Sequence, residues 1–481
     1  MRERYLAIDL GTTSVKAGVF SSDGTLLAHV RQTYPTHRSE GGRCEQDPAD
    51  WTRLIDKAVN GFHQRFAPET FAAGALTSQI NTHVFVGRDG APLMPAILWQ
   101  DTRAEAEAAE LDRLLSEADK IAWLGAPIPI DASHLLARML WTKRHRPDVW
   151  DRTSHVLLPK DYALLHLTGA LATDPLSNVG VVGVDGRYVE NILNLVPGAT
   201  ERMAPLCPIT DIMASTRQGV PMAVATLDGW VGLMGTGACA EGSFVYLSGT
   251  SEILGVASRT VTHAPGIIVF NEAGGLKLHA GPTQSGGASQ VWFADLAGLS
   301  FEALAASVAA LPSSRRTPLF LPQLAGERAP IWNAGLRGAF LGLESGMGTG
   351  DLAKAVYEGV ALSARHVFEA VEASAGQQAE WVACGGGGFH ADPWGQIRAD
   401  VLGKPMKRLA ITDTGLVGAA CIAAVAAGDA TTLWDAQRAY ARFDTTFEPN
   451  HALRGRYDDL FGIYLDAIEA HEAIGNRLRT L

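Results

Sequence analysis

The chain has 481 residues, too many for one ordinary hydrophobic core, so we expect two domains or two large lobes. Hydrophobic residues make up 47% and charged residues 19%, a composition that indicates a folded globular protein and excludes a disordered one. The net charge of −11 argues against nucleic acid or an anionic membrane as the main partner, although local N–H groups can still hold the phosphates of ATP.

The five cysteines lie far apart, without a Cys-x-x-Cys pair: Cys44, Cys207, Cys239, Cys384 and Cys421. That spacing favours buried, reduced thiols over a zinc site or a disulfide framework. The sequence has no signal-peptide pattern at its start, and its apolar stretches are too short to cross a bilayer. We therefore expect a cytoplasmic protein that does not bind membranes.

The first half of the chain predicts an antiparallel meander followed by mixed strands and helices. Strands are expected at 5–9, 13–20, 26–33, 71–79 and 84–87, with a Ser-Ser-Asp-Gly hairpin turn at 21–24. Helical periodicity and Asp47-Pro48, a good helix start, predict helices at 49–66, 102–122 and 134–146.

The pattern of strand, Gly-Thr turn and strand returns near residue 240. Strand-like segments at 242–248 and 252–258 flank Gly249-Thr250-Ser251. So short a repeat can arise by chance; if it is real, the protein consists of two related lobes with one phosphate-gripping turn on each. The boundary would fall near 235–241. Further helices are expected at 287–311, 351–375, 392–402 and 417–427, with a short strand at 381–384.

The turn from Asp9 to Lys16 has two readings. A strand ends in a carboxylate, a glycine allows a tight turn, and Thr12, Thr13 and Ser14 offer hydroxyls and N–H groups that can wrap a phosphate. Asp9 could then hold magnesium through water. The alternative is a plain hairpin capped by Asp and Thr.

Two glycine turns in the second half offer further phosphate or nucleotide contacts. Ser248-Gly-Thr-Ser251 alone is weak evidence for a phosphate site. The evidence is stronger when this turn is paired with the first one, because a phosphate chain needs donors on both sides. The glycines at 385–388 follow a short strand and allow a flat ring or a phosphate to lie against the backbone. The alternative is a structural turn. Neither a Rossmann nor a Walker glycine pattern occurs.

Asp228 follows an apolar segment and precedes a glycine-containing helix. In that position it could take a proton from a substrate hydroxyl. A helix N-cap is the competing reading, and the local sequence favours it.

Together these features resemble the FGGY carbohydrate kinases, within the actin-like, ribonuclease-H-like ATPase superfamily. The resemblance covers essentially the whole chain and is strongest to bacterial xylulokinases. It implies phosphate motifs at Asp9–Lys16 and Leu247–Ser251, an adenosine motif at Gly385–Gly388, and a catalytic aspartate at Asp228. Further similar stretches lie at 96–103, 157–162, 320–330, 338–343 and 351–358.

The chain departs from the xylulokinase pattern at the expected sugar pocket. The Met-His pair that touches the ketose in xylulokinases falls on Ile80-Asn81. Asn81 is shorter than histidine and cannot become charged. His83 would share a face with Asn81 if this segment were a strand, and an ordinary strand histidine is the favoured reading. Gly229 and Arg138 also replace the usual Asn and Lys.

The resemblance implies a two-domain α/β protein of the actin-like fold, with an interdomain cleft between 1–240 and 241–481. It further implies ATP and Mg²⁺, with the phosphates between the turns at 11–13 and 249–251. We expect phosphorylation of a terminal hydroxyl of a small sugar, with a pentulose such as xylulose as first choice. The alternatives are another ketose or polyol (ribulose, a tetritol, glycerol) and a non-sugar actin-like ATPase.

The expected site residues follow from the same resemblance. Asp228 and Asp9 are the expected catalytic and metal-associated residues, and a homodimer is an open expectation. The sugar pocket is assigned to Gln79, Ile80, Asn81, Trp99 and Asp228. The ATP site is assigned to Gly11, Thr12, Thr13, Lys16, Gly249, Thr250, Ser251, Gly385, Gly386, Gly387 and Gly388.

Overall fold

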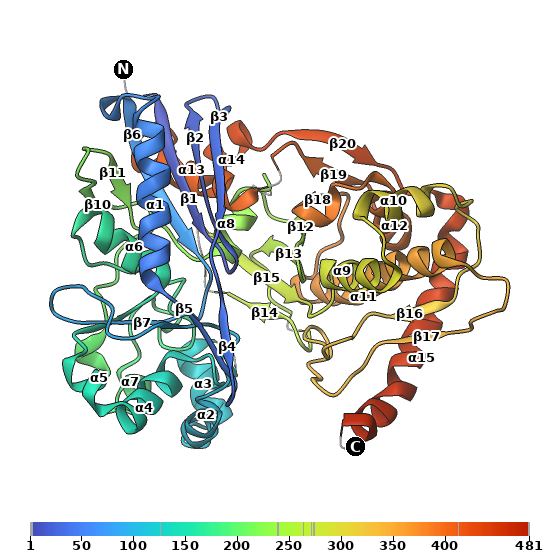
Figure 1. Cartoon of the computed structure of the whole chain (residues 1–481), viewed down its shortest axis with the longest axis horizontal. Coiled ribbons are helices and arrows are strands. Elements are labelled where there is room, and N and C mark those ends of the chain that lie inside the picture. The colour runs from blue at the N-terminus through green and yellow to red at the C-terminus, as the bar shows by residue number, and fades with distance from the viewer. Residues whose placement is uncertain are drawn as a thin grey trace. The chain divides into compact units, whose positions relative to one another are not determined.

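The computed structural model describes residues 3–125, 127–237, 240–262, 264–270, 272, 275–411 and 413–479. The chain forms two compact units. Unit 1 comprises Met1–Gly235 and Gly415–Tyr440, and unit 2 comprises Thr236–Thr414 and Ala441–Leu481. Figure 1 labels the elements of both units. Ala238 and Cys239, within the expected boundary, lie outside the described residues.

Unit 1 contains a six-stranded mixed sheet in the order β10-β11-β6-β1-β2-β3. Strands β1, β2 and β3 form the expected antiparallel meander, and β6 lies parallel to both β1 and β11. The bounds are β1 Arg4–Leu10, β2 Ser14–Ser21, β3 Leu26–Thr33, β6 Phe71–Ser78, β10 Ile212–Ser215 and β11 Pro221–Ala223. Short strands β4 His37–Ser39, β5 Arg43–Gln46 and β8 Ala96–Ile97 form a second sheet, and β7 Val84–Val86 pairs with β9 His155–Leu157.

Unit 2 repeats this topology in a seven-stranded sheet, β14-β15-β13-β12-β18-β19-β20. The hairpin β12–β13 is antiparallel, β12 and β18 are parallel, and so are β18 and β19. The six strands from β15 to β20 therefore match those from β3 to β10 in direction and order, so the short sequence repeat reflects a repeated sheet. The bounds are β12 Ser243–Ser248, β13 Glu252–Ser258, β14 Ile268–Val269, β15 Lys277–Pro282, β18 Val382–Gly385, β19 Met406–Leu409 and β20 Phe443–Phe447. A separate pair joins β16 Leu319–Leu321 and β17 Ala339–Leu341.

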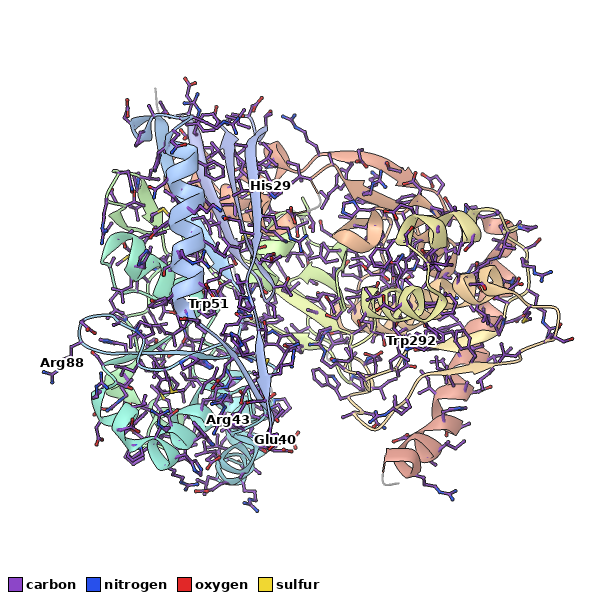
Figure 2. All side chains as sticks on the ribbon, in the orientation of Figure 1. His29, Glu40, Arg43, Trp51, Arg88 and Trp292 are labelled. Atoms are coloured by element: carbon purple, nitrogen blue, oxygen red, sulfur yellow. The ribbon has the colours of Figure 1, made fainter. Side chains whose placement is uncertain are left out.

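The helix that follows the meander, α1 (Pro48–His63), shows how sequence sets position. The Asp47 carboxylate accepts the Ala49 N–H at 2.9 Å, and Pro48 occupies the first turn, where a missing N–H costs nothing. Trp51 on α1, labelled in Figure 2, is fully buried. Its Nε1 donates to Gln46 Oε1 at 3.1 Å, so α1 is fixed to the end of β5.

Two expected helices are each broken into two. The segment 102–122 forms α2 (Glu105–Asp112) and α3 (Glu117–Leu124), because Ser116 caps a new helix by accepting the Asp119 N–H. The segment 287–311 forms α9 (Gly287–Ala297) and α10 (Phe301–Ala309), because Gly298 at φ 65° ends the first helix. In the described part of the chain, no single helix is long and apolar enough to cross a membrane; α9 and α10 pass such a test only jointly and meet at 94°.

The remaining helices are divided between the two units. In unit 1 they are α4 Leu135–His145, α5 Pro147–Arg152, α6 Pro159–Thr168, α7 Glu190–Leu193, α8 Asp228–Met234 and α14 Leu433–Tyr440. In unit 2 they are α11 Thr349–Ala375, α12 Asp392–Leu402 and α15 Arg454–Arg479, of which α15 was not expected. Helix α11 is buried along most of its length and is the centre of that unit's core. Among the described residues, Cys44, Cys207, Cys384 and Cys421 form no disulfide bond.

The compact units differ from the expected domains in one segment. The sequence predicts 415–440 within the C-terminal domain, whereas its contacts put it in unit 1. Helix α13 (Thr414–Ala426) packs so closely on α8 that a Cβ added to Gly418 would overlap the Val231 carbonyl. Beyond α13, the Asp429 carboxylate accepts a hydrogen bond from Tyr5 of β1 at 2.6 Å. Contacts made far along the chain therefore decide the assignment.

The close packing at Gly418 predicts a loss of stability on adding one methyl group. Gly418→Ala should destabilise unit 1 by about 1–3 kcal/mol, because the neighbouring atom is backbone and cannot rotate away. Gly61→Ala in α1 is the matched control: a Cβ there meets nothing within 4 Å, so removing a helical glycine should stabilise by about 0.5–1 kcal/mol. Thermal unfolding of both variants measures the difference; equal shifts would contradict the packing of α13 on α8.

Candidate functional site

The chemistry of unit 1 collects where its parallel strands end. Asp9 is the penultimate residue of β1, Gln79 follows β6, and Asp228 begins α8 shortly after β11. Because β11, β6 and β1 are parallel neighbours, their carboxyl ends lie along the same sheet edge. The strand directions therefore bring together three residues that lie far apart in the sequence.

Asp9 and Asp228 form an electrostatically coupled pair of carboxylates. Burial, and then the negative charge of Asp9, raise the pKa of Asp228 to about 7, while the Gly229 N–H and the Lys16 ammonium oppose that shift. Lys16 Nζ lies 3.5 Å from Asp9 Oδ2. A carboxyl with a pKa close to 7 can accept a proton at neutral pH and release it again, which is what a general base must do.

The competing interpretation of Asp228 as a helix cap is partly correct. By backbone conformation Leu227 is the N-cap of α8 and Asp228 is its first residue. The Asp228 carboxylate nevertheless accepts a hydrogen bond from the Gly229 backbone, as an acidic residue in a first turn does. The two interpretations therefore do not exclude each other.

A buried ion cluster supports the segment just before Asp228. Lys160 Nζ lies 2.6 Å from Asp161 and 2.8 Å from Asp174, and all three side chains are buried. Thr226 donates its hydroxyl to Asp174 at 2.7 Å, and its carbonyl accepts from Thr77 Oγ1 of β6, also at 2.7 Å. Thr226 is thus fixed from two sides, which restricts where Asp228 can lie.

The turn between β1 and β2 is a tight hairpin. Leu10 pairs with Val15, and the Gly11 N–H donates to the Ser14 carbonyl at 3.1 Å. The Tyr34 hydroxyl donates to the Gly11 carbonyl. The side chain of Thr13 is exposed. The hairpin geometry is therefore confirmed, and the phosphate-binding role of Gly11, Thr12, Thr13 and Lys16 stays a prediction.

A chain of hydrogen bonds connects this turn with the expected sugar pocket. Gln46 donates to the Thr12 carbonyl at 2.7 Å and accepts from Gln79 at 3.2 Å. On the other side, Trp99 Nε1 donates to the Thr12 hydroxyl at 3.2 Å, while its backbone N–H donates to Thr82 Oγ1 at 3.2 Å. Residues Gln79 and Trp99, assigned to the sugar, therefore lie beside Thr12, assigned to ATP.

Asn81 and His83 do not share one face of a strand, because the segment that carries Asn81 is not a strand. Residues 79–82 lie between β6 and β7 and not in a strand, and Asn81 has a left-handed backbone with φ 50°. Asn81 donates to Ser133 Oγ at 3.2 Å. His83 is buried, and its Nδ1 lies 2.9 Å from Arg138 Nη1. Burial, followed by the charge of Arg138, lowers the pKa of His83 well below its ordinary value, so this histidine is a neutral core residue.

Arg138 holds the backbone around the expected pocket, a role that the sequence did not indicate. Its guanidinium is fully buried and donates to the carbonyls of Asn81, Ile97 and Leu98. It therefore ties the loop that carries Asn81 to the segment that leads into Trp99. Burial lowers the pKa of Arg138 to about 9.

In unit 2 the turn after β12 rests on the start of α9. The Gly249 N–H donates to the Ser251 carbonyl at 2.9 Å. The N–H groups of Gly287 and Ala288 donate to the carbonyls of Gly249 and Thr250, each at 2.9 Å. The carbonyls of the turn are thereby satisfied inside the protein, and the side chain of Thr250 is exposed.

The glycines at 385–388 are expected to leave room for a ligand, but most of them are needed for close packing within unit 2. A Cβ on Gly386 or Gly388 would overlap Ser248, and a Cβ on Gly385 would come within 3.1 Å of Leu409. Only Gly387 is open, with His390 as its nearest neighbour at 4.0 Å. Gly386 and Gly388 are thus needed by the fold and Gly385 is tightly packed, whereas Gly387 is the position whose exposed backbone suits a ligand.

Gly415, near the start of α13, is a site residue that the sequence analysis missed. A Cβ there would lie 2.7 Å from Asp9 Oδ2. The segment before the expected helix at 417–427 gave no periodic or motif pattern of its own, and its proximity to Asp9 arises only from the fold.

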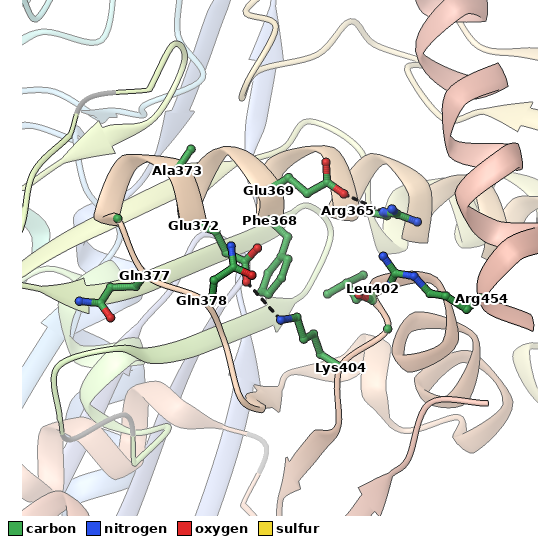
Figure 3. Close-up of a pocket in the computed structure, with 12 residues that line it drawn as sticks. Arg365, Phe368, Glu369, Glu372, Ala373, Gln377, Gln378, Leu402, Lys404 and Arg454 are labelled. Carbon is green, nitrogen blue, oxygen red and sulfur yellow. Dashed lines mark hydrogen bonds and ion pairs between the residues drawn. The ribbon is translucent and has the colours of Figure 1, made fainter. Parts of the chain in front are cut away.

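A hollow on the surface of unit 2, shown in Figure 3, is lined by none of these residues. It has a volume of about 690 Å³ and lies in unit 2 between α11, the loop after it and Arg454. Its cations Arg365, Lys404 and Arg454 are paired with Glu369, Glu372 and Asp458. Within the described ranges, no group of three or more His, Cys, Asp or Glu side chains forms a metal site.

Comparison with known proteins gives consistent matches over nearly the whole chain. Residues 4–229 match the N-terminal domain of the FGGY family of carbohydrate kinases, and residues 245–427 match its C-terminal domain. A xylulose kinase from Staphylococcus epidermidis is 27% identical over 486 residues, covering 96% of each chain.

Two solved structures show the same fold. A xylulose kinase from Rhodospirillum rubrum is 25% identical, with a TM-score of 0.86 over 98% of this chain and 99% of that one. A gluconate kinase from Lactobacillus acidophilus is 21% identical, with a TM-score of 0.88 over 99% of each chain. Two proteins named for different sugars superpose equally well, so the fold by itself does not identify the sugar.

The raised pKa of Asp228 predicts a pH-dependent stability effect. Because the folded state binds this proton more tightly than the unfolded state, ionising Asp228 as the pH rises through about 7 costs stability. Asp228→Asn should therefore raise the unfolding temperature, by at least about 2 °C more at pH 8 than at pH 5. Asp459→Asn, an exposed position in α15, is the control and should show no such pH dependence. A gain that is equal at both pH values would contradict the buried, coupled carboxyl.

Proposed function

We propose a specific reaction for this chain, which belongs to the FGGY family of carbohydrate kinases: ATP-dependent phosphorylation of a terminal hydroxyl of a small sugar, with a pentulose such as xylulose as first choice. The observation that carries it is the pair Asp9 and Asp228 at the carboxyl edge of one sheet, beside the turn at Gly11–Thr13. The xylulose kinase names of the similar proteins support the choice of sugar.

Asp228 acts as the general base in this reaction. Its carboxylate takes the proton of the sugar hydroxyl while that oxygen attacks the γ-phosphorus of ATP. A phosphorus–oxygen bond forms to the sugar, the bond to the β-phosphate oxygen breaks, and ADP leaves. Burial and the nearby Asp9 keep the pKa of Asp228 at about 7, so the base is partly ionised and still strong at neutral pH.

Each unit contributes groups for the nucleotide. In unit 1, the N–H groups and hydroxyls of Gly11, Thr12 and Thr13 and the ammonium of Lys16 would bind phosphate. In unit 2, the exposed turn at 249–251 would bind phosphate and Gly387 would leave room for adenosine. This assignment follows the expected domains 1–240 and 241–481, except for the segment 415–440.

The carboxylate pair also suits a magnesium ion. Asp9 and Asp228 repel each other, as the raised pKa of Asp228 records, and a cation beside them would relieve that repulsion. Magnesium prefers few protein carboxylates with water and phosphate oxygens completing its shell, so the absence of a third described ligand is compatible with it. When bound, it would neutralise phosphate charge.

The sugar pocket in this proposal is lined by Gln79, Ile80, Asn81 and Trp99. A different ketose or polyol is the alternative substrate. Asn81 supports this alternative, because its uncharged amide stands where xylulokinases have a histidine ring that can carry charge. A second alternative, a non-sugar actin-like ATPase, would release ADP without any acceptor. The enzyme is proposed to act in the cytoplasm.

A coupled ADP-release assay across pentuloses, hexuloses, tetritols, glycerol and gluconate tests the reaction. We expect ADP release to depend on one pentulose and to fall at least about a hundredfold in Asp228→Ala, the usual loss on removing a general base. Calorimetric binding of ADP to that variant should remain close to wild type. Flat ADP release over the panel would favour the ATPase, and more than a few per cent residual activity would remove Asp228 from the base role.

The position of Asn81 predicts a change in sugar preference. Asn81→His should reorder the kcat/KM values among ketoses by about tenfold or more, because a buried polar group mismatched to a sugar hydroxyl is costly. Histidine tolerates the left-handed backbone at this position better than most residues. Ser133→Ala is the control, since it removes the hydrogen bond to Asn81 and leaves the Asn81 side chain in place. An unchanged ranking in Asn81→His would show that this residue does not face the sugar.

A further inference from the structure

Arg398 of α12 is a buried cation that contacts both glycine turns of unit 2. Its side chain is fully buried. Nη1 donates to the carbonyl of Gly388 at 2.6 Å, and Nη2 donates to Ser248 Oγ at 2.8 Å. Ser248 immediately precedes the turn at 249–251, so one guanidinium group bridges the two turns that we assign to phosphate and adenosine.

Glu252, on the far side of the first turn, completes this bridge. Arg398 Nη2 lies 2.5 Å from Glu252 Oε1, and Ser248 Oγ donates to the same oxygen at 2.9 Å. The Tyr246 hydroxyl donates to Oε2 at 2.6 Å. The backbone N–H of Glu252 donates to Thr283 Oγ1 at 3.0 Å. The turn at 249–251 is therefore held at both ends, by Ser248 and by Glu252.

Three aromatic rings prevent the guanidinium group from moving. The Arg398 Cζ atom lies 3.9 Å from the ring centroid of Trp394, 4.4 Å from that of Phe389 and 5.1 Å from that of Tyr246. Such contacts with a desolvated cation are among the stronger cation–π interactions. The planar fork is thus fixed in orientation as well as paired in charge.

The glycines opposite Arg398 show how close the two turns are. A Cβ on Gly386 or Gly388 would overlap Ser248, so the backbone at 386–388 lies directly against the end of β12. Contact this close fixes the spacing of the turns, and Arg398 is the group that bonds to both sides of it.

We propose that Arg398 is a positioning residue for ATP: through Gly388, Ser248 and Glu252 it fixes the turns at 249–251 and 385–388 relative to each other. The inference rests on the proposed function, in which these turns bind the nucleotide. Arg398 touches neither substrate. It acts by holding exposed backbone groups in one arrangement before ATP arrives, so its loss weakens nucleotide binding and leaves the sugar pocket of unit 1 unchanged.

Arg398→Lys tests this role, because it keeps the charge and removes the fork that reaches three acceptors. We expect the Kd for ADP, measured by calorimetry, and the KM for ATP to rise about tenfold, the usual effect of losing a hydrogen bond to a charged group. The KM for the best sugar of the panel should stay within about twofold of wild type. Ser248→Ala removes two hydrogen bonds, the one from Arg398 and the one to Glu252, and no charge. It should shift the same two constants in the same direction by about threefold.

Arg365→Lys is the matched control. Arg365 is also a buried arginine of unit 2, paired with Glu369 and Asp458 and lying 4.4 Å from the Phe461 ring, but it contacts neither turn. Its variant should keep both constants at wild-type values even where its unfolding temperature falls as far as that of Arg398→Lys.

The outcomes separate this inference from the function on which it rests. A wild-type protein that binds no ADP contradicts the nucleotide assignment itself. A wild-type protein that binds ADP, with Arg398→Lys and Ser248→Ala binding it equally well, makes Arg398 a core residue and overturns the inference. If Arg398→Lys does not fold, Ser248→Ala decides alone, and an unchanged Kd for ADP in that variant overturns the inference.

Discussion

The parallel pairing of β1 with β6 and of β12 with β18 is the constraint on which the rest of both units depends. A hairpin alone would leave its turn at an exposed end with nothing beside it. Adding a parallel strand next to the first arm of the hairpin brings a second chain segment to the same edge, because parallel strands end on the same side. In unit 1 that segment carries Gln79, and in unit 2 it carries the glycines at 385–388.

The carboxyl edge of the sheet carries different groups in the two units. Unit 1 places charge there: Asp9, Lys16 and Asp228 interact electrostatically, and the pKa of Asp228 rises because burial and Asp9 both disfavour its ionised form. In unit 2 this edge carries the glycine turns, and the charged pair Arg398 and Glu252 is buried. One sheet topology therefore carries a pair of carboxylates in one unit and glycine turns in the other.

The sequence was sufficient for features that depend on neighbours along the chain. The meander, the hairpin turns at Gly11 and Gly249, the helix start at Asp47-Pro48 and the acidic residue at 228 follow from local periodicity and turn chemistry. The resemblance to a family supplied the roles. Local rules failed where one residue changed the backbone, as at Asn81, whose left-handed conformation ends the alternation that would have placed His83 beside it.

Contacts between distant segments could not be predicted in this way. Arg398 and Ser248 are 150 positions apart, Arg138 and Asn81 are 57 apart, and nothing in either local sequence indicates the partner. The placement of 415–440 in unit 1 and the proximity of Gly415 to Asp9 have the same origin. The four glycines at 385–388 show a related difficulty: the composition is visible, but only the fold shows that Ser248 requires two of them.

The buried arginines stabilise backbone at two places by different means. Arg398 has a carboxylate partner, so its charge is balanced and its bonds to Gly388 and Ser248 add direction. Arg138 relies on three carbonyls and the neutral His83, and burial accordingly lowers its pKa to about 9. Buried cations of this kind are costly to leave unpaired, so each enforces a single arrangement of the groups around it.

Around Arg138 these groups are the Asn81 loop and the segment that leads into Trp99, and a lysine there could not bond to all of them at once. The shape of the expected sugar pocket thus depends on a residue that lines none of it, which is why substitutions at Ile80 and Asn81 can alter the sugar while the surrounding backbone stays in place.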